Sequence, residues 1–125
     1  MSTKFLAGVL LLIVTAALGV LIYQSLNSGG SKLSDLSYVG QTPPDVVIID
    51  ETVYTRADNL AWIRDLNLQA YRLLGGVNRT GVTSGFKNFD ATAIPVGTAI
   101  YAVSERTDIV LVLLGGVNIP YYAEN

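Results

Sequence analysis

The sequence predicts an N-terminal single transmembrane α-helix followed by a small mainly-β (α+β) domain, an antiparallel curled sheet or small open barrel with one short helix. Three observations support this prediction. An apolar run without a charged residue fills positions 5–23. From position 45 onward, short apolar runs alternate with turn-forming residues, a pattern typical of antiparallel strands. The chain has 125 residues, so the part after the apolar run is long enough for one domain.

The apolar run has the length and the ends of a membrane-spanning helix. At about 1.5 Å per residue, residues 5–23 would cover roughly 28 Å, which is close to the hydrocarbon thickness of a bilayer. Phe5 and Tyr23 stand at its ends, where aromatic side chains favour the membrane interface. Lys4 places a positive charge in the short segment before the apolar run. We therefore expect a cytoplasmic N-terminus (residues 1–4), a transmembrane helix (residues 5–23) and an extracytoplasmic C-terminal domain on the cell membrane.

A cleaved signal peptide is the alternative interpretation of this run. Such a peptide has a shorter apolar region, about 7–15 residues, followed by small residues at the cut. Thr15, Ala16 and Ala17 are small but lie inside the run, and nothing after Tyr23 fits a cleavage site well. We prefer an uncleaved signal-anchor of a single-pass protein, with a secreted soluble protein as the alternative.

The segment after the apolar run is predicted to be a flexible tether. Residues 24–44 are rich in Ser and Gly and end in Pro43 and Pro44, which is typical of linkers. The β-rich domain is then expected to occupy residues 45–125.

Six or seven strands can be placed within this domain. They are predicted over residues 46–49, 52–55, 70–74, 77–80, 99–103, 109–114 and 117–122. The predicted tight turns are Asp50-Glu51, Gly75-Gly76 and Gly115-Gly116. A short helix is expected over residues 59–66, capped by Asp58. The predicted core residues are Ile48, Val53, Trp62, Leu74, Ile94, Ile100, Val110 and Val112.

One six-residue sequence, LLGGVN, occurs twice. It fills Leu73–Asn78 and again Leu113–Asn118, but the residues on either side of the two copies do not match. We interpret the copies as two independent strand–turn–strand units, with a duplicated unit as the alternative, because repeat architectures normally need three or more units.

Composition excludes several classes of chemistry. The chain contains no histidine and no cysteine, so it lacks the residues of a His-dependent protease, a thiol redox site or a structural zinc site. Its formal net charge is −2 without basic clusters, which argues against nucleic-acid binding. We expect no catalytic residue, no metal and no cofactor. A carboxylate-dependent hydrolase is the alternative, because a pair of acids across a cleft could act as acid and base.

Three stretches of the chain resemble a known group of proteins. They are GGVNRTGVTSGFKNFDAT (residues 75–92), IPVGTAIY (residues 94–101) and IPYYA (residues 119–123). The sequence resembles uncharacterised small membrane-anchored proteins of Gram-positive, Bacillus-like bacteria. The resemblance implies an N-terminal apolar helix and an extracytoplasmic domain, and it brings no activity or functional residue with it.

The loop over residues 79–92 is the candidate partner-binding site. Arg79, Phe86, Lys87 and Phe89 interleave aromatic and basic side chains along it, and long loops in compact domains are often binding loops. The alternative is that the two phenylalanines pack back onto the sheet. The sequence thus predicts a non-enzymatic binding or accessory module of the bacterial cell envelope, whose partner is another envelope protein or a cell-wall component.

Overall fold

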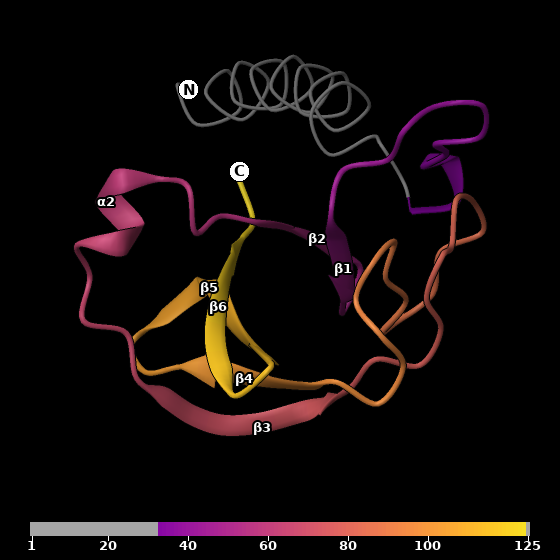
Figure 1. The fold of residues 1–125 in the computed structure, drawn as a ribbon. Coiled ribbons are helices and arrows are strands. Elements are labelled where there is room, and N and C mark those ends of the chain that lie inside the picture. Colours follow the sequence, from indigo (N-terminus) through magenta and orange to yellow (C-terminus); the bar gives the residue numbers. More distant parts are fainter. Residues whose placement is uncertain (1–32, 125) are drawn as a thin grey trace, which may run out of the picture. The chain divides into compact units, whose positions relative to one another are not determined.

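A computed structural model describes residues 33–124, which form a mainly-β unit with one short helix (Figure 1). The strands are β1 (Val46–Ile49), β2 (Thr52–Arg56), β3 (Ala70–Gly76), β4 (Ala99–Val103), β5 (Arg106–Leu114) and β6 (Val117–Tyr122). A 3₁₀ turn, η1 (Leu33–Asp35), precedes them, and the helix α2 (Ala61–Arg64) links β2 to β3.

All six strands belong to one antiparallel sheet in the order β1-β2-β6-β5-β4-β3. The sheet curls into a half-barrel, which brings its edge strands β1 and β3 to opposite sides of the interior (Figure 1). The predicted class, a curled antiparallel sheet with one short helix, is confirmed for this part of the chain.

Several predicted segments lie outside the described residues. They are the cytoplasmic N-terminus (residues 1–4), the transmembrane helix (residues 5–23) and the first part of the tether (residues 24–32). Within residues 33–124, no helix is long and apolar enough to cross a membrane.

The rest of the predicted tether packs against the domain. Leu33, Leu36 and Tyr38 are half-buried against the apolar cluster of Ile48, Val82 and Phe86. The backbone N–H of Tyr38 also donates to the carbonyl of Thr83 at 2.7 Å. Residues 33–38 of the predicted tether therefore pack on the domain, because the apolar residues in this stretch contact a distant loop.

The core lies on both faces of the curled sheet. Inside the curl, one cluster joins Ile100, Val110, Val112 and Tyr121. On the outer face, a second cluster packs α2 against β4 and β5. Five of the predicted core residues, Ile48, Ile94, Ile100, Val110 and Val112, are buried, and Val53 and Leu74 are half-buried.

The helix differs from its prediction in length, cap and orientation. It covers a single turn, and Leu60 occupies the N-cap without a side-chain hydrogen bond. Asp58 instead accepts hydrogen bonds from Arg56. Because a one-turn helix buries one narrow face, Ile63 is 1% exposed while Trp62 is 42% exposed. The prediction of Trp62 as a core residue was therefore wrong.

Two of the three predicted turns are correct. Asp50 and Glu51 both have positive φ, as do Gly115 and Gly116, and each pair joins two adjacent antiparallel strands. Gly75 and Gly76 form no turn. They continue β3 and pair with β4, and the predicted strand over residues 77–80 is absent from the strands of residues 33–124.

Candidate functional site

Arg79 and Asp90 form the anchor of the loop over residues 79–92. The Arg79 Nε donates to one Asp90 carboxylate oxygen at 2.9 Å, and its Nη2 contacts the other. The same Nη2 donates to the Gly85 carbonyl at 3.1 Å. The backbone N–H of Lys87 donates to Asp90 at 2.7 Å, so three groups converge on a carboxylate that is only 1% exposed.

These contacts set the ionisation of Asp90. Burial alone would raise the pKa of this carboxyl, but the hydrogen bonds from Arg79 and Lys87 and the Arg79 charge outweigh it and hold the pKa below its ordinary value. The Asp90 side chain is therefore an ionised structural group inside the loop.

Phe86 and Phe89 turn back toward the sheet, as the alternative interpretation of the loop expected. Phe86 is 5% exposed and lies edge-on to Tyr38, with ring centroids 5.9 Å apart. Phe89 is half-buried against the inner core, and its ring covers Gly75 of β3. Only the Lys87 side chain among the four predicted residues is exposed and without a side-chain hydrogen bond within residues 33–124. The structure thus does not gather the four into one exposed site.

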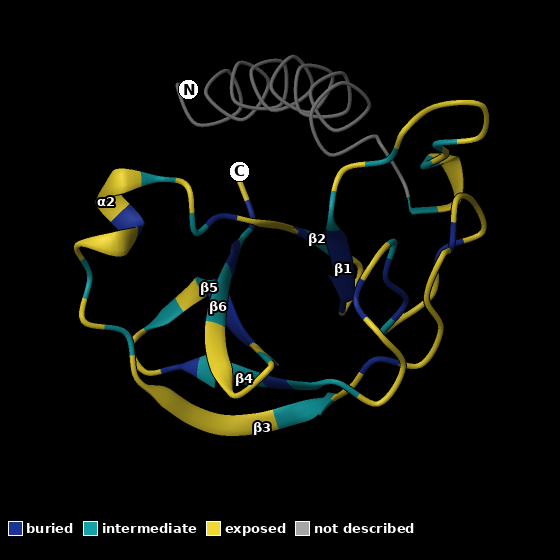
Figure 2. Cartoon of the chain, viewed as in Figure 1, coloured by how far each residue is buried: buried dark blue, intermediate teal, exposed yellow. Residues whose placement is uncertain are grey.

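The same loop closes the barrel at one end. The Ile48 N–H donates to the Asp90 carbonyl, and the Phe89 N–H donates to the Ile48 carbonyl. On the other side, the Asn78 N–H donates to the Phe89 carbonyl. Loop backbone therefore bridges β1 and the end of β3. In Figure 2, β1 is buried along its length, whereas β3 is exposed over most of its own.

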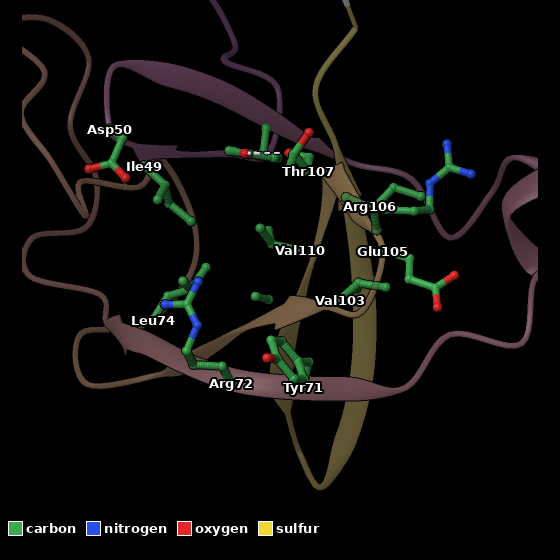
Figure 3. Close-up of a pocket in the computed structure, with 13 residues that line it drawn as sticks. Ile49, Asp50, Tyr71, Arg72, Leu74, Val103, Glu105, Arg106, Thr107 and Val110 are labelled. Atoms are coloured by element: carbon green, nitrogen blue, oxygen red, sulfur yellow. Dashed lines mark hydrogen bonds between the residues drawn. The ribbon is translucent and has the colours of Figure 1, made fainter.

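At the other end of β3 the barrel stays open, and a cleft of about 390 Å³ lies there. We call it the β1–β3 cleft. Its lining residues come from five strands and from the β1–β2 and β4–β5 turns (Figure 3). They are Ile49, Asp50, Tyr54, Tyr71, Arg72, Leu74, Ala102, Val103, Glu105, Arg106, Thr107, Ile109 and Val110. Two other hollows flank α2, and each touches no more than two strands.

Irregularities in β3 bring more of its side chains to the cleft than a regular strand could. The register with β4 shifts between Ala70 and Arg72 and again between Leu73 and Gly75. Successive side chains of a regular strand point to opposite faces. Here Tyr71, Arg72 and Leu74 all line the cleft, because the bulges reorient the strand.

The polar groups of the cleft differ in how they are held. The Tyr54 hydroxyl donates to the Thr107 carbonyl at 3.0 Å, and burial, followed by the charges of Asp50 and Asp108, raises its pKa. The guanidinium of Arg106 is bound to Asp108 at 3.0 and 2.8 Å. Within residues 33–124, Arg72 has no ion pair and no side-chain hydrogen bond.

The acids that lie at the loop and around the cleft are held in different ways. Asp58, Asp90 and Asp108 are each bound to an arginine. Asp50 and Glu105 lie at opposite margins of the β1–β3 cleft, and their carboxylates point away from each other (Figure 3). In the part of the chain that is described, no group of three His, Cys, Asp or Glu residues could hold a metal ion. This arrangement can bind a ligand through apolar contact and charge.

Sequence reasoning missed the β1–β3 cleft and its residues. Tyr71 and Arg72 lie in a run that predicts a strand, but no local signal marks a bulge there. Comparisons with protein families, with curated proteins and with solved structures find no match for this chain. The resemblance to membrane-anchored proteins of Gram-positive bacteria therefore stays a prediction.

Proposed function

We propose that this protein is a membrane-anchored, non-enzymatic binding module of the cell envelope, which binds its ligand in the β1–β3 cleft. The observation that supports this most is the cleft itself. The cleft has a mostly apolar lining built on strands, and β3 carries bulges at the residues that line the cleft. Bulges are over-represented beside functional sites, because they reorient side chains. Concave apolar sites with a few converging polar groups are the usual form of a ligand pocket.

The proposal moves the binding site away from the loop over residues 79–92. Arg79 and Asp90 hold that loop together, and Phe86 is buried beneath it. A loop whose polar groups are satisfied internally offers few groups to a partner. We therefore propose that the loop is structural and that it keeps one end of the barrel closed while the other end stays open.

A ligand screen on the full-length protein tests the site. The protein would be reconstituted in lipid nanodiscs with labelled methyl groups, and a fragment library would be added during NMR spectroscopy. We expect shifts at Ile49, Leu74 and Val110, which line the cleft. Leu111 is the matched control, since it neighbours Val110 but packs on the outer face of the sheet. Shifts confined to residues 79–92, or no shifts at all, would contradict the proposal.

The anchor is proposed from the sequence and needs a separate test. Membrane fractionation combined with protease treatment of intact cells would follow a C-terminal tag. We expect a membrane-bound protein whose tag is degraded from outside, because residues 5–23 are proposed to span the membrane with residues 1–4 in the cytoplasm. N-terminal sequencing distinguishes the alternative, since a mature start beyond Ala17 would mean a secreted soluble protein.

A further inference from the structure

We propose that the β1–β3 cleft recognises a small ligand with an apolar body and a single carboxylate, and that the Arg72 guanidinium receives that carboxylate. This inference rests on the binding function proposed above and specifies its ligand class. It is carried by the state of Arg72, by the local shape of β3 and by the charges around the cleft.

Arg72 differs from the arginines that the fold uses for its own stability. Arg56, Arg79 and Arg106 each bind an aspartate in a forked arrangement. Arg72 is exposed and has no such partner within residues 33–124, and it lines a cleft whose walls include Leu74 and Val110. A guanidinium presents a planar fork that matches the two oxygens of a carboxylate, and such charge-assisted pairs are among the strongest hydrogen bonds in proteins.

The bulge before Arg72 adds an aromatic residue to the lining of the cleft. Tyr71 is the residue left over where the register shifts between Ala70 and Arg72, and it lines the same cleft as Arg72. Its side chain is 69% exposed, so its ring is available to a ligand. Figure 3 shows Arg72 extending from β3 toward β1, in the direction of Ile49. A ligand could therefore place its polar head at Arg72 and its body on the apolar wall.

The charges around the cleft favour a ligand with a single negative charge over a ligand with several. Asp50 and Glu105 stand at the margins of the cleft and would repel a phosphate or a dicarboxylate more than a monocarboxylate. The volume of about 390 Å³ lies in the lower part of the range of ligand pockets, which favours a small molecule.

Three probes of nearly equal shape test the inference. They are 3-phenylpropionate, 3-phenylpropan-1-ol and 3-phenylpropylamine, titrated into the full-length protein in nanodiscs with binding followed at the methyl groups of Leu74 and Val110. We expect the acid to bind about tenfold or more tightly than the alcohol, because a hydrogen bond to a charged group supplies that difference. The amine should bind no better than the alcohol.

Variants assign the difference to Arg72. Arg72→Gln should bring the affinity of the acid down to that of the alcohol and leave the alcohol unchanged. Arg72→Lys, which keeps the charge but loses the fork, should retain part of the preference. Arg64→Gln is the matched control, since Arg64 is exposed on α2, has no ion pair within residues 33–124 and does not line the cleft. Thermal unfolding of each variant checks that the fold is intact.

The outcomes separate this inference from the function on which it rests. Equal affinity for the acid and the alcohol, with shifts at the cleft, would overturn the carboxylate assignment and leave the binding site standing. Tightest binding of the amine would overturn it in favour of cation recognition by Asp50 and Glu105. Absence of cleft shifts with all three probes and with the fragment library would overturn the binding function as well.

Discussion

The two copies of LLGGVN have the same six residues and adopt different structures. In the copy over residues 113–118, Gly115 and Gly116 have φ of 57° and 80° and form the two-residue turn between β5 and β6. In the copy over residues 73–78, Gly75 and Gly76 lie within β3 and pair with Ile100 and Ala99 of β4. The same six-residue sequence therefore forms a hairpin turn over residues 113–118 and part of an edge strand over residues 73–78.

The surroundings of the glycines explain the difference. No atom lies within 4 Å of the position that a Cβ would take at Gly115 or Gly116, so that turn is formed by its own backbone and the pairing of the flanking strands. At Gly75, such a Cβ would lie 2.7 Å from the end of the Phe89 ring. The first copy needs glycine for a close tertiary contact as well as for its φ of 158° at Gly75, whereas the second needs it for the backbone conformation of the turn alone. A local sequence cannot reveal which of these needs applies.

The largest expected effect concerns the loop that covers the first copy. We expect Asp90→Asn to lower the free energy of unfolding by about 3 kcal/mol, because it removes the charge of a buried carboxylate that accepts hydrogen bonds from the half-exposed Arg79 and from the Lys87 N–H. The measurement is denaturant unfolding of the full-length protein in detergent, followed by the fluorescence of Trp62, the single tryptophan. Asp58→Asn is the control and should cost less than about 1 kcal/mol, since its pair with Arg56 is exposed. Equal costs would show that the loop does not depend on Asp90.

Low pH should weaken the contact between Arg79 and Asp90. The pKa of Asp90 is lowered in the folded state, so its contribution is present above the unfolded pKa of about 3.9 and is lost as the pH falls through the folded pKa. Asp58 and Asp108 have lowered pKa values for the same reason, bonding to arginine. The wild type should therefore lose stability below about pH 4, and Asp90→Asn should show a shallower loss. Parallel pH profiles would contradict this assignment.

The next effect separates the two kinds of glycine. Gly75→Ala should cost about 2 kcal/mol, because the added methyl group must displace the half-buried ring of Phe89 and the residue must keep a φ of 158°. Adding Phe89→Leu should recover part of this loss, since the shorter side chain frees the space. A double-mutant cycle measures the coupling. If the two substitutions are additive, the close contact is not the reason for glycine at this position.

The hairpin of the second copy should respond differently. Gly116→Ala should cost about 1 kcal/mol from backbone strain at positive φ. Gly115→Asn should be close to neutral, because Asn tolerates this conformation and Asn-Gly is favoured in such turns. Asn at Gly75 would meet the Phe89 ring instead and should cost at least as much as Ala there. Unfolding curves of the three variants rank these costs, and equal losses at Gly75 and Gly115 would remove the distinction.

The smallest effect at neutral pH is expected at Tyr121, in the strand that follows the hairpin. Its hydroxyl is buried beside Asp45 and makes no hydrogen bond of ordinary geometry within residues 33–124, so Tyr121→Phe should change stability by less than about 1 kcal/mol. Burial and the nearby Asp45 charge raise the pKa of Tyr121 in the folded state. Stability is thus fully present below about pH 10 and lost as the pH rises further.

Tyr121→Phe should therefore reduce the alkaline loss, which pH-dependent unfolding would show. The loss of stability that remains at alkaline pH should come from Tyr54, whose pKa is also raised. An unchanged alkaline profile in the variant would mean that Tyr121 ionises normally in the folded protein.

Local patterns predicted much of the fold. The bounds of β1, β4 and β6 agree with those predicted from their β-branched and apolar runs, and Asp50-Glu51 forms the predicted turn. These elements are formed by short-range pairing, which alternation and turn chemistry encode. The cleft was not predictable in this way, and the inward packing of the loop was expected only as one of two alternatives. Phe86 and Phe89 interleave with charged residues in the sequence, yet they pack inward because distant apolar partners on β1 and β3 receive them.

The sequence by itself determined the antiparallel strands, most of their ends and the absence of histidine and cysteine chemistry. The tertiary structure alone decided the use of each LLGGVN copy, the inward packing of the loop and the cleft at Arg72. The physical reason is the distance along the chain over which each feature is determined. Strand periodicity and turn conformation are local properties of the chain, whereas the bulges of β3 and the ring over Gly75 depend on segments brought together only when the sheet curls.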